Sequence, residues 1–188
     1  MSCALGERLV AEALPGWNLA RASIDTRGVT KLIPALPRYL EQAIHVQPVL
    51  CVADTDGQCP VTLLHRWMPT QTSDRFLLRL AVSEAESWLL ADRSAIAEYF
   101  GLAVRLVPQQ PDLLGNAKQE VLRLARRSRV REIRQELVSG TDSNRPGSGY
   151  NLHLCRFVQQ RWRAGRGALN SASLARALRR VADLGQGH

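Results

Sequence analysis

The stretch that decides the fold is Val49-Leu50-Cys51-Val52-Ala53-Asp54-Thr55-Asp56-Gly57, an apolar run that ends in two aspartates and a glycine. The run predicts a buried strand with acids at its tip. Since side chains two residues apart leave the same face of an extended chain, Asp54 and Asp56 can point at one spot. Such a pair can hold Mg²⁺, which needs only one or two protein carboxylates beside water and substrate phosphates. The alternative is a turn, because Asp-Gly is typical of hairpins and aspartate caps its own backbone.

The sequence around this run predicts a parallel α/β sheet. Residues 17–24, 48–53 and 75–82 have strand-like apolar patterns, and helical patterns separate them. Strands that alternate with helices are typical of a parallel sheet. After this part only helical patterns remain, so we expect an α/β core over residues 1–92 and an α-helical C-terminal region over 93–188.

Composition and charge restrict the possible functions. The 188 residues are 45% hydrophobic and carry a formal net charge of +8, which favours a polyanionic partner such as DNA or RNA. Lys31 and Lys118 are the only lysines, and a GC-rich genome would produce the same arginine bias without any function. No apolar stretch is long enough to cross a bilayer, and no signal peptide is apparent, so we expect a cytoplasmic protein without membrane contact.

A second pair of acids follows the last predicted strand. Glu84 and Glu86 stand directly after it, so a parallel sheet would bring them to the same carboxyl edge as Asp54 and Asp56. Acids in a first helical turn also complement the helix dipole, and Ser83 with Glu86 has the spacing of a capping box. We interpret Glu86 as the capping residue. For Glu84 both interpretations stay open, and it is the candidate third carboxylate of a metal site.

An arginine-rich stretch follows Lys118. It is a candidate nucleic-acid-binding cluster, because arginines neutralise backbone phosphates. The alternative is a solvated helix face that pairs with Glu120 and Glu132. The candidate residues are Arg126, Arg127, Arg129 and Arg131.

Six short motifs are spread over nearly the whole chain. They are Asp54-Thr55-Asp56-Gly57, the Trp-Leu-Leu-Ala-Asp core within residues 79–92, Asn116-Ala117-Lys118, the arginine-rich residues 124–131, the Gly-x-x-Tyr-Asn loop at 147–151 and the Ser-x-Ser-Leu segment at 171–174. Together they resemble an uncharacterised bacterial family with a Toprim-like fold, related to overcoming-lysogenization-type nucleases.

The resemblance implies a fold and a chemistry. Toprim domains have a Rossmann-like sheet, bind Mg²⁺ or Mn²⁺ through acidic strand ends, and make or break phosphodiester bonds. Carried onto this chain, Asp54, Asp56 and Glu84 would hold the metal. In the nuclease branch a lysine assists by offsetting charge in the transition state, which makes Lys118 a candidate beside its alternative as a solvated helix residue. Members are often encoded beside AAA-type ATPases in apparent phage-defence loci, which implies an ATPase partner.

One feature departs from the Toprim pattern. Toprim domains begin with a strand that ends in a catalytic glutamate, whereas this chain opens almost directly on a helix, so we expect a sheet without its first strand. Glu7 and Glu12 do not replace that glutamate, because they lie on the helix itself. Either the start site is set too far downstream, or this is a shortened member with impaired chemistry.

Three functions are compatible with these patterns. The leading hypothesis is a metal-dependent nuclease. The alternative is a noncatalytic nucleic-acid-binding or regulatory subunit of an ATPase complex that keeps the fold without turnover. A small-molecule phosphohydrolase could use the same carboxylates but would leave the positive charge unexplained.

Overall fold

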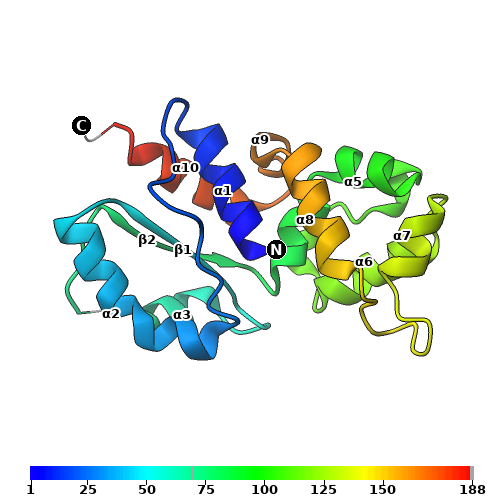
Figure 1. Ribbon diagram of the computed structural model, residues 1–188, viewed down its shortest axis with the longest axis horizontal. Coiled ribbons are helices and arrows are strands. Elements are labelled where there is room, and N and C mark those ends of the chain that lie inside the picture. Colours follow the sequence, from blue (N-terminus) through cyan, green and yellow to red (C-terminus); the bar gives the residue numbers. More distant parts are fainter. Residues whose placement is uncertain (69, 187–188) are drawn as a thin grey trace.

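The computed structural model describes residues 1–68 and 70–186, which form a mixed α/β fold (Figure 1). The first half contains α1 (Ser2–Ala13), α2 (Val29–His45), β1 (Val49–Asp54), α3 (Pro60–Trp67) and β2 (Phe76–Ala81). The second half contains α4 (Ala85–Ala91), α5 (Arg93–Phe100), the 3₁₀ turns η1 (Val104–Leu106) and η2 (Pro111–Leu113), α6 (Ala117–Arg126), α7 (Arg131–Glu136), α8 (Tyr150–Gln160), α9 (Ala164–Gly167) and α10 (Ala172–Asp183). The predicted α/β class is confirmed. None of the described helices is both long and apolar enough to cross a bilayer.

The sheet consists of β1 and β2, which run parallel. Val49 lies opposite Phe76, and the pairing continues to Asp54 opposite Ala81. Helix α3 makes the crossover that a parallel pair requires. The two apolar runs predicted as strands around residues 48–53 and 75–82 are therefore confirmed.

The predicted strand at residues 17–24 is wrong. These residues form an irregular segment between α1 and α2, and the only strands of the described chain are β1 and β2. A strand exists only where a neighbouring backbone pairs with it, and this segment pairs with neither β1 nor β2. Its apolar side chains stay partly in solvent, with Trp17 37%, Leu19 49% and Ile24 48% exposed.

Helices cover both faces of the sheet (Figure 1). On one face, Cys51 and Leu78 pack in a cluster with Leu36 of α2. On the other face, α1 contacts β1 and α10 contacts β2, where Leu77 packs against Val181. Successive strand residues point to opposite faces, and both faces are covered, so both strands are mostly apolar, with Asp54 at the end of β1 and Arg79 inside β2.

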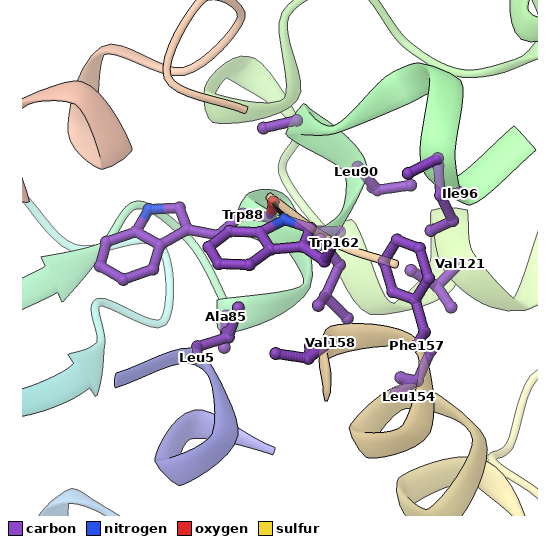
Figure 2. Packing of buried hydrophobic residues seen from close by; sticks show 14 of the residues in the cluster. Leu5, Ala85, Trp88, Leu90, Ile96, Val121, Leu154, Phe157, Val158 and Trp162 are labelled. Atoms are coloured by element: carbon purple, nitrogen blue, oxygen red, sulfur yellow. Dashed lines mark hydrogen bonds between the residues drawn. The ribbon is translucent and has the colours of Figure 1, made fainter. Parts of the chain in front are cut away.

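The main hydrophobic cluster joins α1 to the helical second half. Trp88 and Trp162 are fully buried at its centre, together with Leu5 and Phe157 (Figure 2). The Trp162 indole N–H donates to the Trp88 carbonyl (2.8 Å), and the Trp88 indole N–H donates to Ser173 Oγ (2.8 Å). Residues from both sides of the expected boundary at 92 and 93 thus share one core.

Candidate functional site

Asp54 links the tip of β1 to the start of α4. Its carboxylate accepts a hydrogen bond from the backbone N–H of Ala85 (2.8 Å), the first residue of α4. The first N–H groups of a helix have no acceptor within the helix, so Asp54 caps α4 from the neighbouring strand. The partial positive charge of this helix end also favours a carboxylate there.

The predicted capping box of Ser83 and Glu86 is wrong. Helix α4 begins after Glu84, which is the N-cap residue, and the Glu84 side chain makes no hydrogen bond to a backbone N–H in the first turn of this helix. Ser83 has a left-handed backbone (φ 64°), and its hydroxyl donates to a carbonyl in the loop before α6 (2.7 Å). Glu86 is only 2% exposed and accepts a hydrogen bond from the Tyr150 hydroxyl (2.9 Å). Glu86 is therefore held by Tyr150 of α8.

Glu84 and Lys118 connect α4 to α6. Glu84 Oε2 accepts a hydrogen bond from the Lys118 backbone N–H (2.7 Å), and Glu84 Oε1 lies 3.7 Å from Lys118 Nζ. The same Nζ lies 3.8 Å from Glu86 Oε1. One ammonium group thus faces two carboxylates, so Lys118 is more than a solvated residue of the first helical turn.

Asp54, Glu86, Lys118 and Tyr150 line one cleft of about 320 Å³. The remaining wall is formed by the chain's first residues and by the segment that precedes and begins α8. These wall residues are Met1, Ser2, Pro146, Gly147, Ser148 and Asn151. The cleft lies at the carboxyl end of β1, where parallel α/β sheets bind ligands.

Gly147 allows the wall segment to approach α7 closely. A Cβ atom at this position would overlap the carbonyl oxygen of Glu136 and lie 2.8 Å from that of Val138. The Gly147 N–H donates to the Leu137 carbonyl (2.8 Å), and the Gly147 carbonyl accepts from the Tyr150 N–H (3.2 Å). Only glycine permits such a close backbone contact, which places Tyr150 at the cleft.

Asp56 lies outside this cleft. It belongs to the turn after β1, with an exposed side chain, φ 47°, and an N–H that donates to the Ser83 carbonyl (2.8 Å). Because the regular alternation of the strand ends at Asp54, the two-residue spacing no longer directs both aspartates to one spot. Within the part of the chain that the structure describes, no three His, Cys, Asp or Glu residues are arranged to hold a metal ion. The predicted cluster of Asp54, Asp56 and Glu84 is therefore not formed.

The cleft disfavours ionisation of its own carboxyl groups. Burial, and then repulsion from Glu86, raises the pKa of Asp54 to about 6. Burial also raises the pKa of Glu86, although Lys118 and the Tyr150 hydroxyl oppose that rise. The pKa of Tyr150 is raised by burial and by the Glu86 carboxylate, so its phenol stays protonated and donates. Two carboxylates in such surroundings would be stabilised by an additional cation.

The donor set of the cleft fits a hard divalent cation held by two carboxylates. Asp54 and Glu86 repel each other, and a cation between them would turn that repulsion into attraction. The cleft offers oxygen ligands and neither His nor Cys, which suits Mg²⁺ or Mn²⁺ better than Zn²⁺. With only two protein ligands, the remaining positions would go to water and substrate oxygens.

The raised pKa of Asp54 predicts a pH-dependent stability. Its pKa rises from 3.8 to about 6 on folding, so the folded state binds the proton more tightly, and the free energy of unfolding falls as pH increases through this window. One pKa unit corresponds to about 1.4 kcal/mol, so the full loss of stability caused by the ionised Asp54 at neutral pH is roughly 3 kcal/mol.

We expect Asp54→Asn to reduce the fall in the free energy of unfolding between about pH 4 and 7. Urea denaturation without divalent cations measures this. Glu98→Gln, at an exposed carboxylate on α5, should keep the wild-type profile, and an unchanged profile in Asp54→Asn would contradict this assignment.

The four candidate arginines lie at and after the end of α6. The Arg126 guanidinium donates to the Ser143 carbonyl (2.6 Å), which anchors the loop before α8. The alternative of pairing with Glu120 or Glu132 is not observed, because Glu120 pairs with Arg123 and no ion pair of the described residues involves Glu132. The other three side chains are exposed and, within that same part of the chain, form no ion pair. They are Arg127, Arg129 and Arg131.

The sequence interpretation does not identify Glu86 and Tyr150 as residues of the cleft. The local spacing predicts a capping box for Glu86, whereas its actual partners come from α6 and α8. Tyr150 lies in the Gly-x-x-Tyr-Asn motif of residues 147–151, which was noted only for the family resemblance. This motif is the sequence feature that could have indicated the role of Tyr150 in the cleft.

Comparison of the chain with family models, curated proteins and solved structures finds no match. The likeness to Toprim-like proteins therefore stays a resemblance of motifs. A function has to be inferred from the cleft and from the charged surface beside it.

Proposed function

We propose that this protein is a cytoplasmic, Toprim-like nuclease that cleaves phosphodiester bonds of nucleic acid with the help of Mg²⁺ or Mn²⁺. The observation that supports this proposal best is the pairing of Asp54 and Glu86 in one cleft with Lys118. Two carboxylates with raised pKa values favour a divalent cation, and an adjacent ammonium favours a phosphate group.

Each cleft residue has a distinct role in this proposal. Asp54 and Glu86 would hold the cation, which when bound would polarise the phosphate and lower the pKa of the attacking water. Lys118 offsets the negative charge that develops on phosphate oxygens. Glu84 is a positioning residue, because both its oxygens engage Lys118. Tyr150 orients Glu86 through its hydroxyl, and Asp56 is left out of the ligand set.

Helix α6 connects the cleft to the arginine cluster. Lys118 lies in its first turn and Arg126 is its last residue, which separates them by about 12 Å along the helix axis. Because the rise per nucleotide of one strand is only about 3.4 Å, non-adjacent phosphates of one nucleic-acid strand could contact both ends of this helix. A small-molecule substrate would leave the far end unused, so the surface charge supports a polymeric substrate.

Cleavage assays test the proposed activity. The purified chain is incubated with plasmid DNA and with single-stranded RNA, with Mg²⁺, with Mn²⁺ or with EDTA. We expect cleavage of at least one substrate with a divalent cation and none with EDTA. No cleavage under any of these conditions would contradict the nuclease proposal.

The exposed arginines should set the salt dependence of nucleic-acid binding. We expect replacement of Arg127, Arg129 and Arg131 by glutamine to weaken binding and to reduce the slope of log affinity against log salt by about 0.9 for each lost phosphate contact on duplex DNA. Fluorescence anisotropy at several salt concentrations measures both quantities.

A triple variant of equal charge is the matched control. Its arginines are exposed, and each already bonds a polar side chain; they are Arg21, Arg66 and Arg161. Glutamine at these positions should leave the slope unchanged. Equal effects of the two triple variants would show that net charge, and not the cluster, governs binding.

A noncatalytic nucleic-acid-binding or regulatory subunit is the second candidate function. The observation that favours it is the lack of a three-residue metal group within the described residues. Such a protein would show the salt-dependent binding described above but no cleavage with either cation. Its partner would be an AAA-type ATPase encoded nearby, with a role in phage defence, and both of these expectations rest on the family resemblance alone.

A further inference from the structure

Strand β1 has a second edge that carries no strand. The Val49 N–H donates to the Arg75 carbonyl of the β2 side (2.9 Å), so odd-numbered residues of β1 direct their backbone groups at β2. Alternate residues of a parallel strand direct these groups to opposite edges, so Leu50 and Val52 point theirs away from β2. Among the described strands, β1 pairs with β2 alone, and the N–H groups of Leu50 and Val52 have no other backbone or side-chain acceptor in the described chain.

A groove of about 600 Å³ runs along this free edge. One wall is residues 47–54, and the opposite wall is residues 17–26, which pass the sheet between α1 and α2 (Figure 1). Helix α1 contributes Val10 and Leu14 to the lining, and α2 contributes Leu32. A segment seated here would meet apolar side chains on both of its faces, as buried strands do.

We propose that this groove binds an extended apolar segment of a partner polypeptide, which pairs with β1 as an added strand. The unpaired N–H and C=O groups of Leu50 and Val52 are what such a backbone would satisfy. The six residues of β1 set the length of the segment at five or six residues. An exposed strand edge templates association, and a two-stranded sheet gains stability from a third strand.

The charges along the groove restrict the partner further. The acidic and basic residues of its lining are Glu7, Arg21, Asp25, Asp54 and Asp56. Acids outnumber bases here, although the whole chain has a net charge of +8. The partner segment is therefore an apolar run flanked by basic residues. The acidic lining excludes nucleic acid as the occupant of this groove.

Amide hydrogen exchange with a defined peptide tests the proposal. The probe is a capped Lys-Val-Ile-Thr-Val-Lys peptide added to the full chain. We expect exchange at Leu50 and Val52 to slow on addition of the peptide. Exchange at Cys51 and Ala53, which already face β2, should stay the same.

Two N-methylated versions of the probe provide the matched controls, each blocking one of the two alternating sets of peptide N–H groups. Blocking the set that faces β1 should weaken binding by about tenfold or more, because several backbone hydrogen bonds are lost at once. Blocking the other set should cost less. Equal affinities for both versions, or no slowing at Leu50 and Val52, would overturn strand addition. A dimer that protects these amides without peptide would assign the edge to a second copy and also overturn the proposal.

Discussion

Replacing Asp54 by asparagine should lower divalent-cation-dependent phosphodiester cleavage by more than about 100-fold, because even the outer partners of a bound metal are worth about 10 to 100-fold. Asparagine removes the negative charge but keeps an oxygen that can accept the hydrogen bond from the Ala85 N–H. The variant should therefore fold, and without metal it should be as stable as the wild type or more so, since the buried charge is lost. Initial cleavage rates with saturating Mg²⁺, together with thermal unfolding, measure both properties.

The control for this prediction is Asp56→Asn. Asp56 is exposed in the turn after β1 and lies outside the cleft, so its replacement should reduce cleavage far less than Asp54→Asn. Glu86→Gln should behave like Asp54→Asn. Equal loss of cleavage in the Asp54 and Asp56 variants would restore the ligand set expected from the spacing, and full activity of folded Asp54→Asn would exclude this cleft as the site.

Replacing Trp88 by alanine should destabilise the fold by about 3–5 kcal/mol, as is typical of large buried aromatic side chains. Its indole is fully buried between α4 and the C-terminal helices (Figure 2). The indole N–H of Trp88 bonds Ser173, so the substitution removes that hydrogen bond as well as the packing. Stabilities of many domains are only about 5–15 kcal/mol, so the variant should lose a large share of its stability.

Urea denaturation measures the stability of this variant. Leu169→Ala is the matched control, because Leu169 is 85% exposed and its replacement should change the free energy of unfolding by less than about 0.5 kcal/mol. Trp88→Phe keeps an aromatic ring without the N–H donor and should fall between the two. A loss of under about 1 kcal/mol in Trp88→Ala would contradict the central position of this residue in the core.

The two strands that were predicted correctly are those for which the residues of the strand itself are enough to indicate a strand. Val49–Asp54 and Phe76–Ala81 are mostly apolar, with Asp54 at the end of the first and Arg79 inside the second, and such runs are typical of strands buried on both faces. Residues 17–24 also carry apolar side chains, but their backbone pairs with neither strand. Pairing is a property of the whole sheet, so a local pattern could not distinguish this segment from a strand.

The candidate site was predictable in part for the same reason. Asp54 and Lys118 were found because one ends a strand and the other lies in a motif. Glu86 was missed because its partners, Lys118 and Tyr150, lie 32 and 64 residues away along the chain. Asp56 was placed beside Asp54 by strand spacing, which fails where the backbone turns left-handed at φ 47°.

The position of a bound cation tests the central claim most directly. Mn²⁺ can be titrated into isotope-labelled protein while the paramagnetic broadening of backbone amide signals is recorded. The proposed site predicts that broadening centres on Asp54, Glu86 and Tyr150, that excess Mg²⁺ reverses it, and that Asp54→Asn abolishes it. Broadening centred on another part of the chain, or unchanged by Asp54→Asn, would contradict the assignment of this cleft as the metal site.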